Sequence, residues 1–355
     1  MIRATAQTIA RRSATFAGEL WALAAVVGYT GSNLFGRAGV ALGNPVAGPL
    51  LRDLPSFLLG LSLLSRAGRY RQLLPGRSAF QGAKLVPFVL SGAISVIGTF
   101  AFFFSLSIGG VNIAVPVLQT QLLWGALFGW LLLGERVLPR GVFGIAVTFA
   151  GLCVLAVGQS RGTPVSDAWF TALLLALVPA VAWGLSGVIW RRGQMQGVER
   201  SAGMTVHYGT SVLVSLSFLI IARQLDVYRA LGWESLVSLV MSGICGGVIA
   251  AFAMFTAIKL LPAATVFVLN GLTPLLTAVG GAWFLGEYVN PLMWAGIALT
   301  SLGVVVFQVT KPVRVGAPVV PADVPADVPA AGAPGAPGAA TAAPASDPRP
   351  GRRRP

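Results

Sequence analysis

The segment "WLLLGERVLP" at residues 130–139 ends a long apolar run abruptly, and "WFLGEYVNP" at 283–291 ends a second run in the same way. Both segments read Leu-Gly-Glu-x-Val-x-Pro, and their glutamates, Glu135 and Glu287, stand 152 residues apart in a chain of 355 residues. A period close to half of the chain length indicates an internal duplication. The chain is therefore expected to contain two related halves.

The composition indicates a membrane protein. The chain is 55% hydrophobic and only 10% charged, whereas an average soluble protein carries about 25% charged residues. Ten continuously apolar runs approach the length that a helix needs to cross a bilayer, and continuous runs favour helices over the alternating strands of a barrel. We therefore predict an all-α integral membrane protein with ten transmembrane helices, at 18–36, 46–65, 85–108, 111–133, 141–158, 168–190, 203–222, 235–258, 262–285 and 291–310.

The duplication extends beyond the repeated turn. Adding 152 carries Gly144 onto Gly296, and near the start of each half a shift of about 154 carries Arg37 onto Arg191. Five spans is an odd number, so the second half must enter the membrane from the opposite side, which makes an inverted repeat as in many secondary transporters. The two five-helix repeats are predicted at 18–158 and 168–310.

The Leu-Gly-Glu segments are interpreted as helix ends. Glycine permits a left-handed turn after a helix, and the proline that follows suits the first turn of the next helix. In the predicted topology Glu135 lies at the inner face of the membrane and Glu287 at the outer face. Each carboxylate is either an anchor of the turn or a gating or proton-carrying group.

The distribution of positive charge sets the orientation. The net charge of +14 is compatible with nucleic-acid binding, but with the N-terminus inside, fourteen Lys and Arg fall in inner segments and four in outer loops. This bias predicts a multi-pass protein of the inner or plasma membrane with both termini cytoplasmic, and it excludes a nucleic-acid partner. Residues 1–17 form a cytoplasmic N-terminal segment, and the Pro/Ala/Gly-rich residues 312–355 are predicted to be a disordered cytoplasmic tail.

These features together resemble a known family. Two five-helix halves, each with a fourth helix ending in Leu-Gly-Glu and a glycine-rich fifth helix ("GVFGIAVTFAGLCVLAVG" at 141–158, "LMWAGIALTSLGVVVF" at 292–307), are similar to the EamA-type transporters of the drug/metabolite transporter superfamily. The resemblance covers about residues 18–310. It implies a ten-helix carrier, usually an exporter of amino acids or related metabolites, with a central cavity between the halves. It also suggests protons as a coupling ion.

Two charged residues and a histidine within the apolar runs are candidate functional groups. Arg52 and Asp53 lie inside the second run, and ionisable residues at such depth are costly and usually face a cavity or a partner. Arg52 is a candidate to bind a substrate carboxylate or phosphate, although a structural or interfacial role is an equal alternative. Asp53 and His207 are candidates for coupling or gating, His207 because it titrates near neutral pH.

Polar side chains in the fourth and first helices of each half are further candidates. Polar amides in a membrane need partners, and proline-interrupted segments at corresponding places in two halves point to a transporter site. Interhelical packing is the alternative explanation. The candidate substrate contacts, besides Arg52, are Gln119, Gln121, Trp124, Asn270 and Thr273 in the fourth helices, and Tyr29, Asn33 and Trp183 in the first helices.

Other classes of protein are weighed against this interpretation. "GLSG" at 184–187 matches intramembrane serine proteases, with Ser186 as nucleophile and His207 as base, but small residues for helix packing explain it better. A single histidine and the lack of a phosphate-binding loop argue against a metal site and against ATP hydrolysis, so we expect no enzyme and no cofactor. A membrane-embedded hydrolase and a non-transporting receptor or assembly protein stay as alternatives to a carrier of a small molecule.

Overall fold

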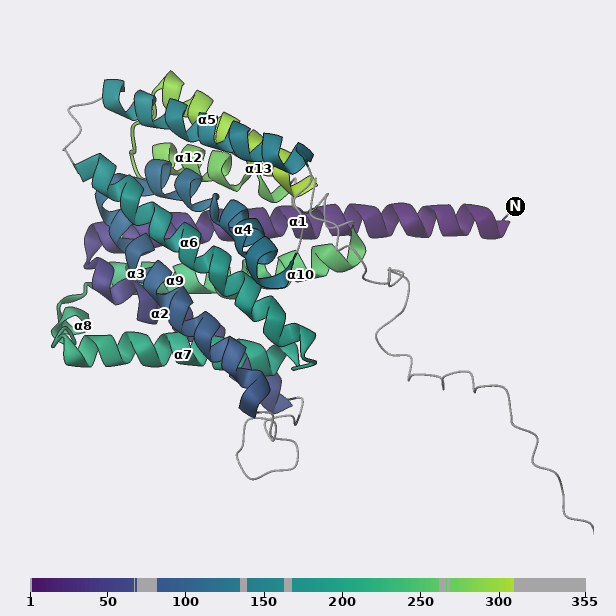
Figure 1. The fold of residues 1–355 in the computed structure, drawn as a ribbon, viewed down its shortest axis with the longest axis horizontal. Helices are drawn as coiled ribbons and strands as arrows, with labels where there is room; N and C mark the ends of the chain where they lie inside the picture. The colour runs from purple at the N-terminus through teal and green to yellow at the C-terminus, as the bar shows by residue number, and fades with distance from the viewer. Residues whose placement is uncertain are drawn as a thin grey trace, which may run out of the picture. The chain divides into compact units, whose positions relative to one another are not determined.

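The described part of the chain is helical throughout (Figure 1). The computed structural model describes residues 2–66, 68, 82–134, 139–162, 168–261, 266 and 269–309, and its regular elements are helices. The helices before residue 163 are α1 (Ile2–Leu42), η1 (Pro45–Ala47), α2 (Gly48–Arg66), α3 (Gly82–Leu118), α4 (Gln121–Leu133) and α5 (Pro139–Gly162). The later ones are α6 (Ala168–Met195), α7 (Arg200–Ile221), α8 (Asp226–Ala230), α9 (Trp233–Gly243), η3 (Ile244–Ala250), α10 (Ala251–Leu260), α12 (Thr273–Phe284) and α13 (Pro291–Val309). The predicted tail at 312–355 lies outside the described residues.

Six helical stretches in the described ranges are long and apolar enough to cross a membrane, and two more apolar helices are shorter. The six are Pro45–Arg66, Gly82–Leu118, Gly141–Gly158, Ala168–Met195, Arg200–Ile221 and Trp233–Met254. The two shorter ones are Leu123–Leu133 and Pro291–Phe307. The set is smaller than the ten predicted runs, partly because breaks divide some of those runs.

One predicted break is present, and two others were not predicted. Between the runs 85–108 and 111–133, Gly110 has the non-helical φ and ψ of 68° and −176°, so α3 consists of two helical segments joined at a kink. The predicted run 111–133 is also interrupted at the turn Gln119–Thr120, and the run 235–258 contains the π-helical turn η3. Such π-helical turns are frequently found at functional sites.

The repeated Leu-Gly-Glu segments end helices as predicted. Gly134 follows α4 in the left-handed conformation, with φ 68° and ψ 23°, and Gly286 follows α12 with φ 65°. These dihedral angles are costly for residues with a Cβ. The next helices, α5 and α13, begin at the prolines of the two segments, Pro139 and Pro291. The turn chemistry inferred from the sequence is confirmed.

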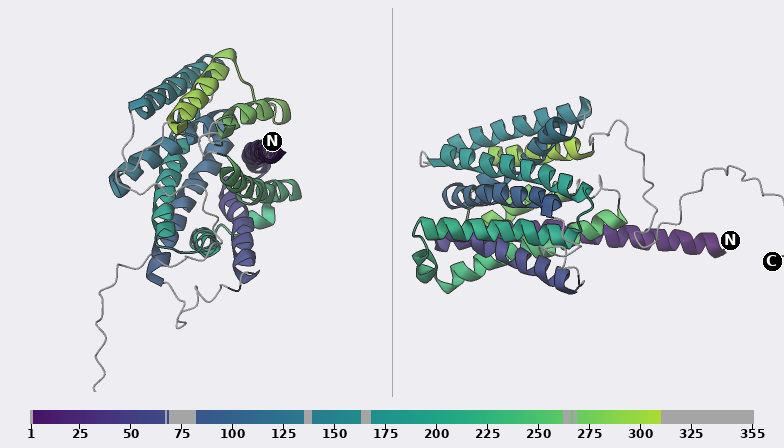
Figure 2. Two further views of the ribbon diagram at one scale, coloured as in Figure 1. Left: turned by 90° about the vertical axis from the view of Figure 1, so that its right-hand side faces the viewer. Right: turned by 60° about the horizontal axis from the view of Figure 1, so that its bottom comes forward.

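Helices α5 and α13 hold corresponding places in the two halves and pack closely together (Figures 1 and 2). Gly151 lies against the backbone of Thr300, and Gly303 lies against the backbone of Thr148. The two contacts are equivalent under the repeat, because Gly303 stands 152 residues after Gly151 and Thr148 stands 152 residues before Thr300. The two helices are therefore related by an approximate two-fold rotation.

The same pair of helices runs in opposite directions. Gly144, near the start of α5, touches the backbone of Phe307 near the end of α13, whereas Gly158 touches Met293 near the start of α13. Glycine at these positions lets the two backbones approach, as small residues do at membrane helix interfaces. Equivalent helices of the two halves are thus antiparallel.

Paired serines repeat the relationship elsewhere in the bundle. Ser32 of α1 donates to the carbonyl of Ser242 in α9 at 2.8 Å, and Ser242 donates back to the carbonyl of Ser32 at 2.7 Å. In the same manner Ser186 of α6 donates to the carbonyl of Ser91 in α3 at 3.0 Å. Because α1 packs on α9 as α6 packs on α3, each half contributes its first helix to the other half. This exchange encloses the space between the halves.

Candidate functional site

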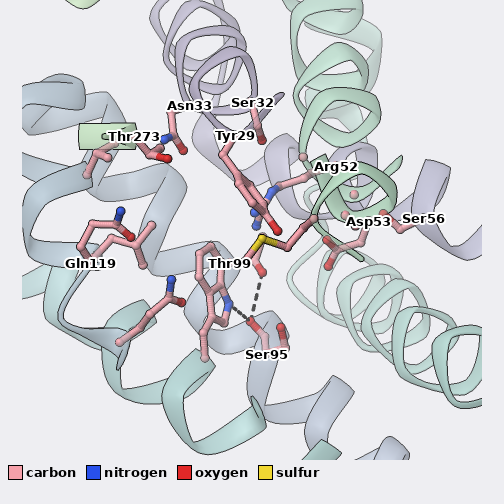
Figure 3. A pocket seen from close by; sticks show the side chains of 18 of the residues that line it. Tyr29, Ser32, Asn33, Arg52, Asp53, Ser56, Ser95, Thr99, Gln119 and Thr273 are labelled. Atoms are coloured by element: carbon pink, nitrogen blue, oxygen red, sulfur yellow. Dashed lines mark hydrogen bonds between the residues drawn. The ribbon is translucent and has the colours of Figure 1, made fainter. Parts of the chain in front are cut away.

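A cavity of about 390 Å³ lies within the helix bundle and is lined by residues from both halves (Figure 3). Eight of the nine side chains that the sequence proposed as substrate contacts line it, and Asp53 lines it too. The eight are Tyr29, Asn33, Arg52, Gln119, Gln121, Trp183, Asn270 and Thr273. Residues as far apart in the chain as Tyr29 and Thr273, separated by 244 positions, thus meet around one space.

Arg52 supplies the positive charge of the cavity wall. Its guanidinium carbon lies 4.7 Å from the ring centre of Trp183 and 5.5 Å from that of Phe102. The ring of Trp183 is fixed in turn, because its Nε1 donates to the carbonyl of Ser95 at 3.0 Å. In the described part of the chain no carboxylate forms a salt bridge with Arg52. A guanidinium packed on aromatic rings keeps N–H donors available for a ligand.

Asp53 follows Arg52 in α2 but has a separate environment. Only 5% of the residue is exposed, and one carboxylate oxygen accepts a hydrogen bond from the hydroxyl of Ser211 in α7. Figure 3 shows Asp53 beside Ser56, on the side of the pocket away from Gln119 and Thr273. The carboxyl group of Asp53 therefore lies on the side of the cavity formed by α2 and α7.

The opposite side of the cavity is made of amides and hydroxyls at two helix breaks. Gln119 lies in the turn between α3 and α4, and Asn270 lies just before the turn that precedes α12. Thr273 donates to the amide oxygen of Asn270 at 3.3 Å, and the amide of Asn33 donates to Thr277 at 3.4 Å. The breaks arise where the sequence places Gln-Thr and Gly-Leu in otherwise apolar helices.

Trp124 and His207 lie elsewhere. Trp124 stacks on Phe128 within α4, with ring centres 6.4 Å apart, and does not line the cavity. His207 is 7% exposed, and its Nδ1 lies 2.7 Å from the hydroxyl of Ser91. Ser186, the nucleophile of the protease alternative, is hydrogen-bonded to Ser91 at 2.9 Å rather than to His207. All three groups of this Ser–His cluster are buried and none of them lines the cavity, so a substrate has no path to them there.

Glu287 forms a second polar centre, at the break in α3. Its carboxylate accepts from Nε of Arg37 at 2.9 Å, from the amide of Asn112 at 2.8 Å and from the backbone N–H of Val111 at 3.1 Å. Arg37 also donates to the carbonyl of Ser107 at 3.1 Å. We call Arg37, Val111, Asn112 and Glu287 the Glu287 cluster. It joins α1 and α3 of the first half to the α12–α13 connection of the second. The corresponding Glu135 lies outside the described residues.

Several cavity residues were not proposed from the sequence. They include Ser32, Ser56, Ser95, Thr99 and Tyr208, together with Gly246 and Gly247 of η3. The helical spacing of some of these residues could have indicated them. Ser32 follows Tyr29 by three residues and Thr99 follows Ser95 by four, so each pair lies on one helix face. The contribution of η3 had no comparable signal, because Gly247 reaches the cavity through the π-helical turn.

Comparison with known proteins places this arrangement in a class. A polar cavity enclosed by membrane-spanning helices of two duplicated halves defines a multi-pass membrane transport protein of small molecules. The EamA-like transporter family matches the chain twice, over residues 16–157 and 170–308, and the chain belongs to this family. Both matches agree with the duplication inferred from the repeated turn, and members of the family are transporters rather than enzymes.

The fold is also found among solved structures. One crystal structure matches with a TM-score of 0.54 and 19% sequence identity, covering 83% of this chain and 96% of that chain. At this identity the likeness concerns the fold alone. No curated protein sequence matches the chain.

Proposed function

We propose that the chain forms ten transmembrane helices in two halves of opposite orientation. The antiparallel packing of α5 on α13 supports this, because helices at corresponding places run in opposite directions while their contacts repeat after 152 residues. An approximate two-fold axis perpendicular to these helices turns one half upside down relative to the other. The repeats are assigned to residues 18–158 and 168–310, with both termini on the cytoplasmic side of the inner or plasma membrane.

In this arrangement the protein is a secondary-active transporter, and its substrate occupies the central cavity. The observation that carries this proposal is the cavity wall: Arg52, Gln119 and Asn270 come from different halves, are deep in apolar helices and face one polar space. Polar groups at such depth are expensive, so their convergence on an open cavity rather than on each other favours a ligand site. Export of a small metabolite is the expected direction.

The Glu287 cluster serves as the gate on the outer side. It ties the two halves together through the ion pair of Arg37 with Glu287 and through hydrogen bonds from Val111 and Asn112 to the same carboxylate, so separation of the halves at this face must break these contacts. Glu135 and Arg191 hold the corresponding sequence positions at the other face. If Glu135 and Arg191 form a matching cluster at the inner face, then alternate formation of this cluster and of the Glu287 cluster would expose the cavity to one side at a time.

Reconstituted protein tests this function. Proteoliposomes containing the full chain are loaded with a small-molecule extract of host cells, and efflux is followed by mass spectrometry. We expect a small set of solutes to leave only when the protein is present. Arg52→Gln should abolish their efflux, while Arg66→Gln, an exposed arginine at the end of the same helix, should not. Equal efflux from protein-free liposomes would refute the proposal.

A further inference from the structure

Two half-helices begin at the same cavity. Helix α4 starts at Gln121 after the turn Gln119–Thr120, and α12 starts at Thr273 after a turn at 271–272. Both first residues line the cavity, and they are separated by 152, the period of the duplication. The approximate two-fold symmetry thus brings two equivalent helix starts to one space.

A helix start is electropositive. The N–H groups of its first turn have no partner within the helix, and the terminus acts as about half of a positive elementary charge. Helices α4 and α12 contain 13 and 12 residues, so both are long enough to carry such a dipole. Neither start has a side chain that caps it with a hydrogen bond, although Pro274 in the first turn of α12 supplies no N–H and the N–H of Leu123 in α4 donates to the carbonyl of Thr120 at 2.9 Å. Two such ends at one cavity favour a negatively charged group.

A buried amide beside one of these ends has no partner within the protein. Gln119 is 7% exposed and lines the cavity, and in the part of the chain that the structure describes its side chain makes no hydrogen bond. An amide buried in this way costs free energy unless it meets a water or a ligand. Figure 3 shows Gln119 and Thr273 on the same side of the pocket. The amide N–H₂ is a donor suited to an anionic oxygen.

The charges of the cavity favour an anion despite Asp53. In the described residues Arg52 forms no salt bridge, and the helix starts add N–H donors, although the C-terminal end of α3 lies at the same break as α4 and offsets its charge. The carboxylate of Asp53 is engaged by Ser211 and lies on the side away from Gln119. An anionic group between Arg52 and Gln119 would therefore meet more attraction than repulsion.

We propose that the cavity selects organic anions, with a substrate carboxylate or phosphate held by Arg52, the amide of Gln119 and the N-termini of α4 and α12. This assignment names the substrate class of the proposed transporter and rests on that function. It makes the paired helix breaks part of the binding site. A solute without an anionic group leaves these donors unsatisfied and is rejected, since unpaired buried polar groups are costly.

The efflux experiment with a host-cell extract distinguishes the possible outcomes. We expect the exported solutes to carry a carboxylate or a phosphate, and the retained neutral and cationic solutes to show no loss. Which of the two groups the exported solutes share identifies the ligand chemistry. Export confined to neutral or cationic solutes would overturn the anion site and leave the transporter function intact. No export of any solute would remove the proposed function itself.

Variants test the helix ends separately from the fold. Gln121→Glu places a negative charge in the first turn of α4, which suits the isolated helix but repels a bound anion. We expect its KM for an exported anion to rise about tenfold or more, with the same thermal unfolding midpoint as the parent protein. Gln119→Leu should raise KM similarly, and Gln224→Leu, at an exposed position, should not. An unchanged KM in both Gln121→Glu and Gln119→Leu would contradict the assignment.

Discussion

Arg37 of α1 donates a hydrogen bond from Nε to Oε1 of Glu287 across 2.9 Å, between residues 250 positions apart in the sequence. The two side chains are only 23% and 13% exposed, so water screens the pair weakly. The same carboxylate accepts the N–H of Val111 next to the kink at Gly110. Glu287 therefore joins the turn after α12 to the bend in α3. This contact explains why the apolar run before it ends in Leu-Gly-Glu.

Removal of the Glu287 carboxylate should lower the free energy of unfolding more than removal of the Arg37 guanidinium. Glu287→Gln weakens bonds to Arg37, Val111 and Asn112, whereas Arg37→Gln leaves two of these donors in place. We expect losses of about 1–3 kcal/mol and about 1 kcal/mol in the free energy of unfolding, measured by denaturation in detergent micelles. Equal effects of the two substitutions would argue against the backbone contacts.

The exposed ion pair of Asp226 with Arg229 is the matched control for the Glu287 cluster. Its side chains are 80% and 88% exposed, although its distance of 3.0 Å is nearly the same as that of the buried pair. Surface pairs of this kind contribute little. Arg229→Gln should leave the unfolding midpoint unchanged.

The packing of α5 on α13 gives a prediction about symmetry. In Gly151→Ala and Gly303→Ala the new methyl group would collide with the backbone of Thr300 or Thr148, so both variants should lower the thermal midpoint, and by similar amounts. Gly187→Ala in α6 has open space around it and should be neutral or stabilising, by up to about 1 kcal/mol. A large difference between the Gly151 and Gly303 variants would show that the contacts are not equivalent.

The parts of the fold that depend on local chemistry could be predicted from the sequence. Gly134 and Gly286 adopt left-handed angles, and Pro139 and Pro291 begin helices, because these residue types restrict the backbone themselves. The family and the duplication followed from the same turn.

The parts that depend on tertiary contacts could not be predicted. The position of the break at Gln119–Thr120 and the π-helical turn near Gly247 are decided by close packing against other helices, which periodicity does not reveal. Trp124 shares the fourth helix with Gln121 but does not line the cavity, because it packs beside Gly184 of α6, a contact that the sequence does not reveal. The partners of Glu287 come from residues more than 170 positions away.

The pH dependence of transport should be governed by Asp53. The charged and titratable side chains that line the cavity near it are Arg52, Tyr29 and Tyr208 in the described residues, and Ser211 donates to its carboxylate. Among the described residues of the wall, Asp53 is the one acidic side chain, so its protonation removes their negative charge and an anion should bind more tightly as pH falls. Asp53→Asn should have, at every pH tested, the low KM that the parent protein has at acidic pH. A KM that still changes with pH in this variant would assign the titration to another group.

The buried Ser–His cluster should be structural. Ser91 is hydrogen-bonded to both Ser186 and His207 away from the cavity, so a fluorophosphonate probe should not label the native protein. Ser186→Ala should lower the unfolding midpoint through the loss of its bond to the Ser91 carbonyl, with efflux otherwise retained. Probe labelling that disappears in Ser186→Ala would instead favour the hydrolase alternative.

The inverted arrangement can be tested at one pair of equivalent loops. Residue 43, between α1 and α2, and residue 197, between α6 and α7, are related by the shift of 154 found near the start of each half. Single cysteines at the exposed neighbours Leu42 and Gln196 would be introduced after replacement of Cys153 and Cys245. If the halves are inverted, a membrane-impermeant maleimide should label Leu42→Cys in intact cells and Gln196→Cys only after permeabilisation. If the halves are parallel, both positions lie on the same side and react under the same condition, and the two-fold gating scheme built on Glu135 and Glu287 could not operate.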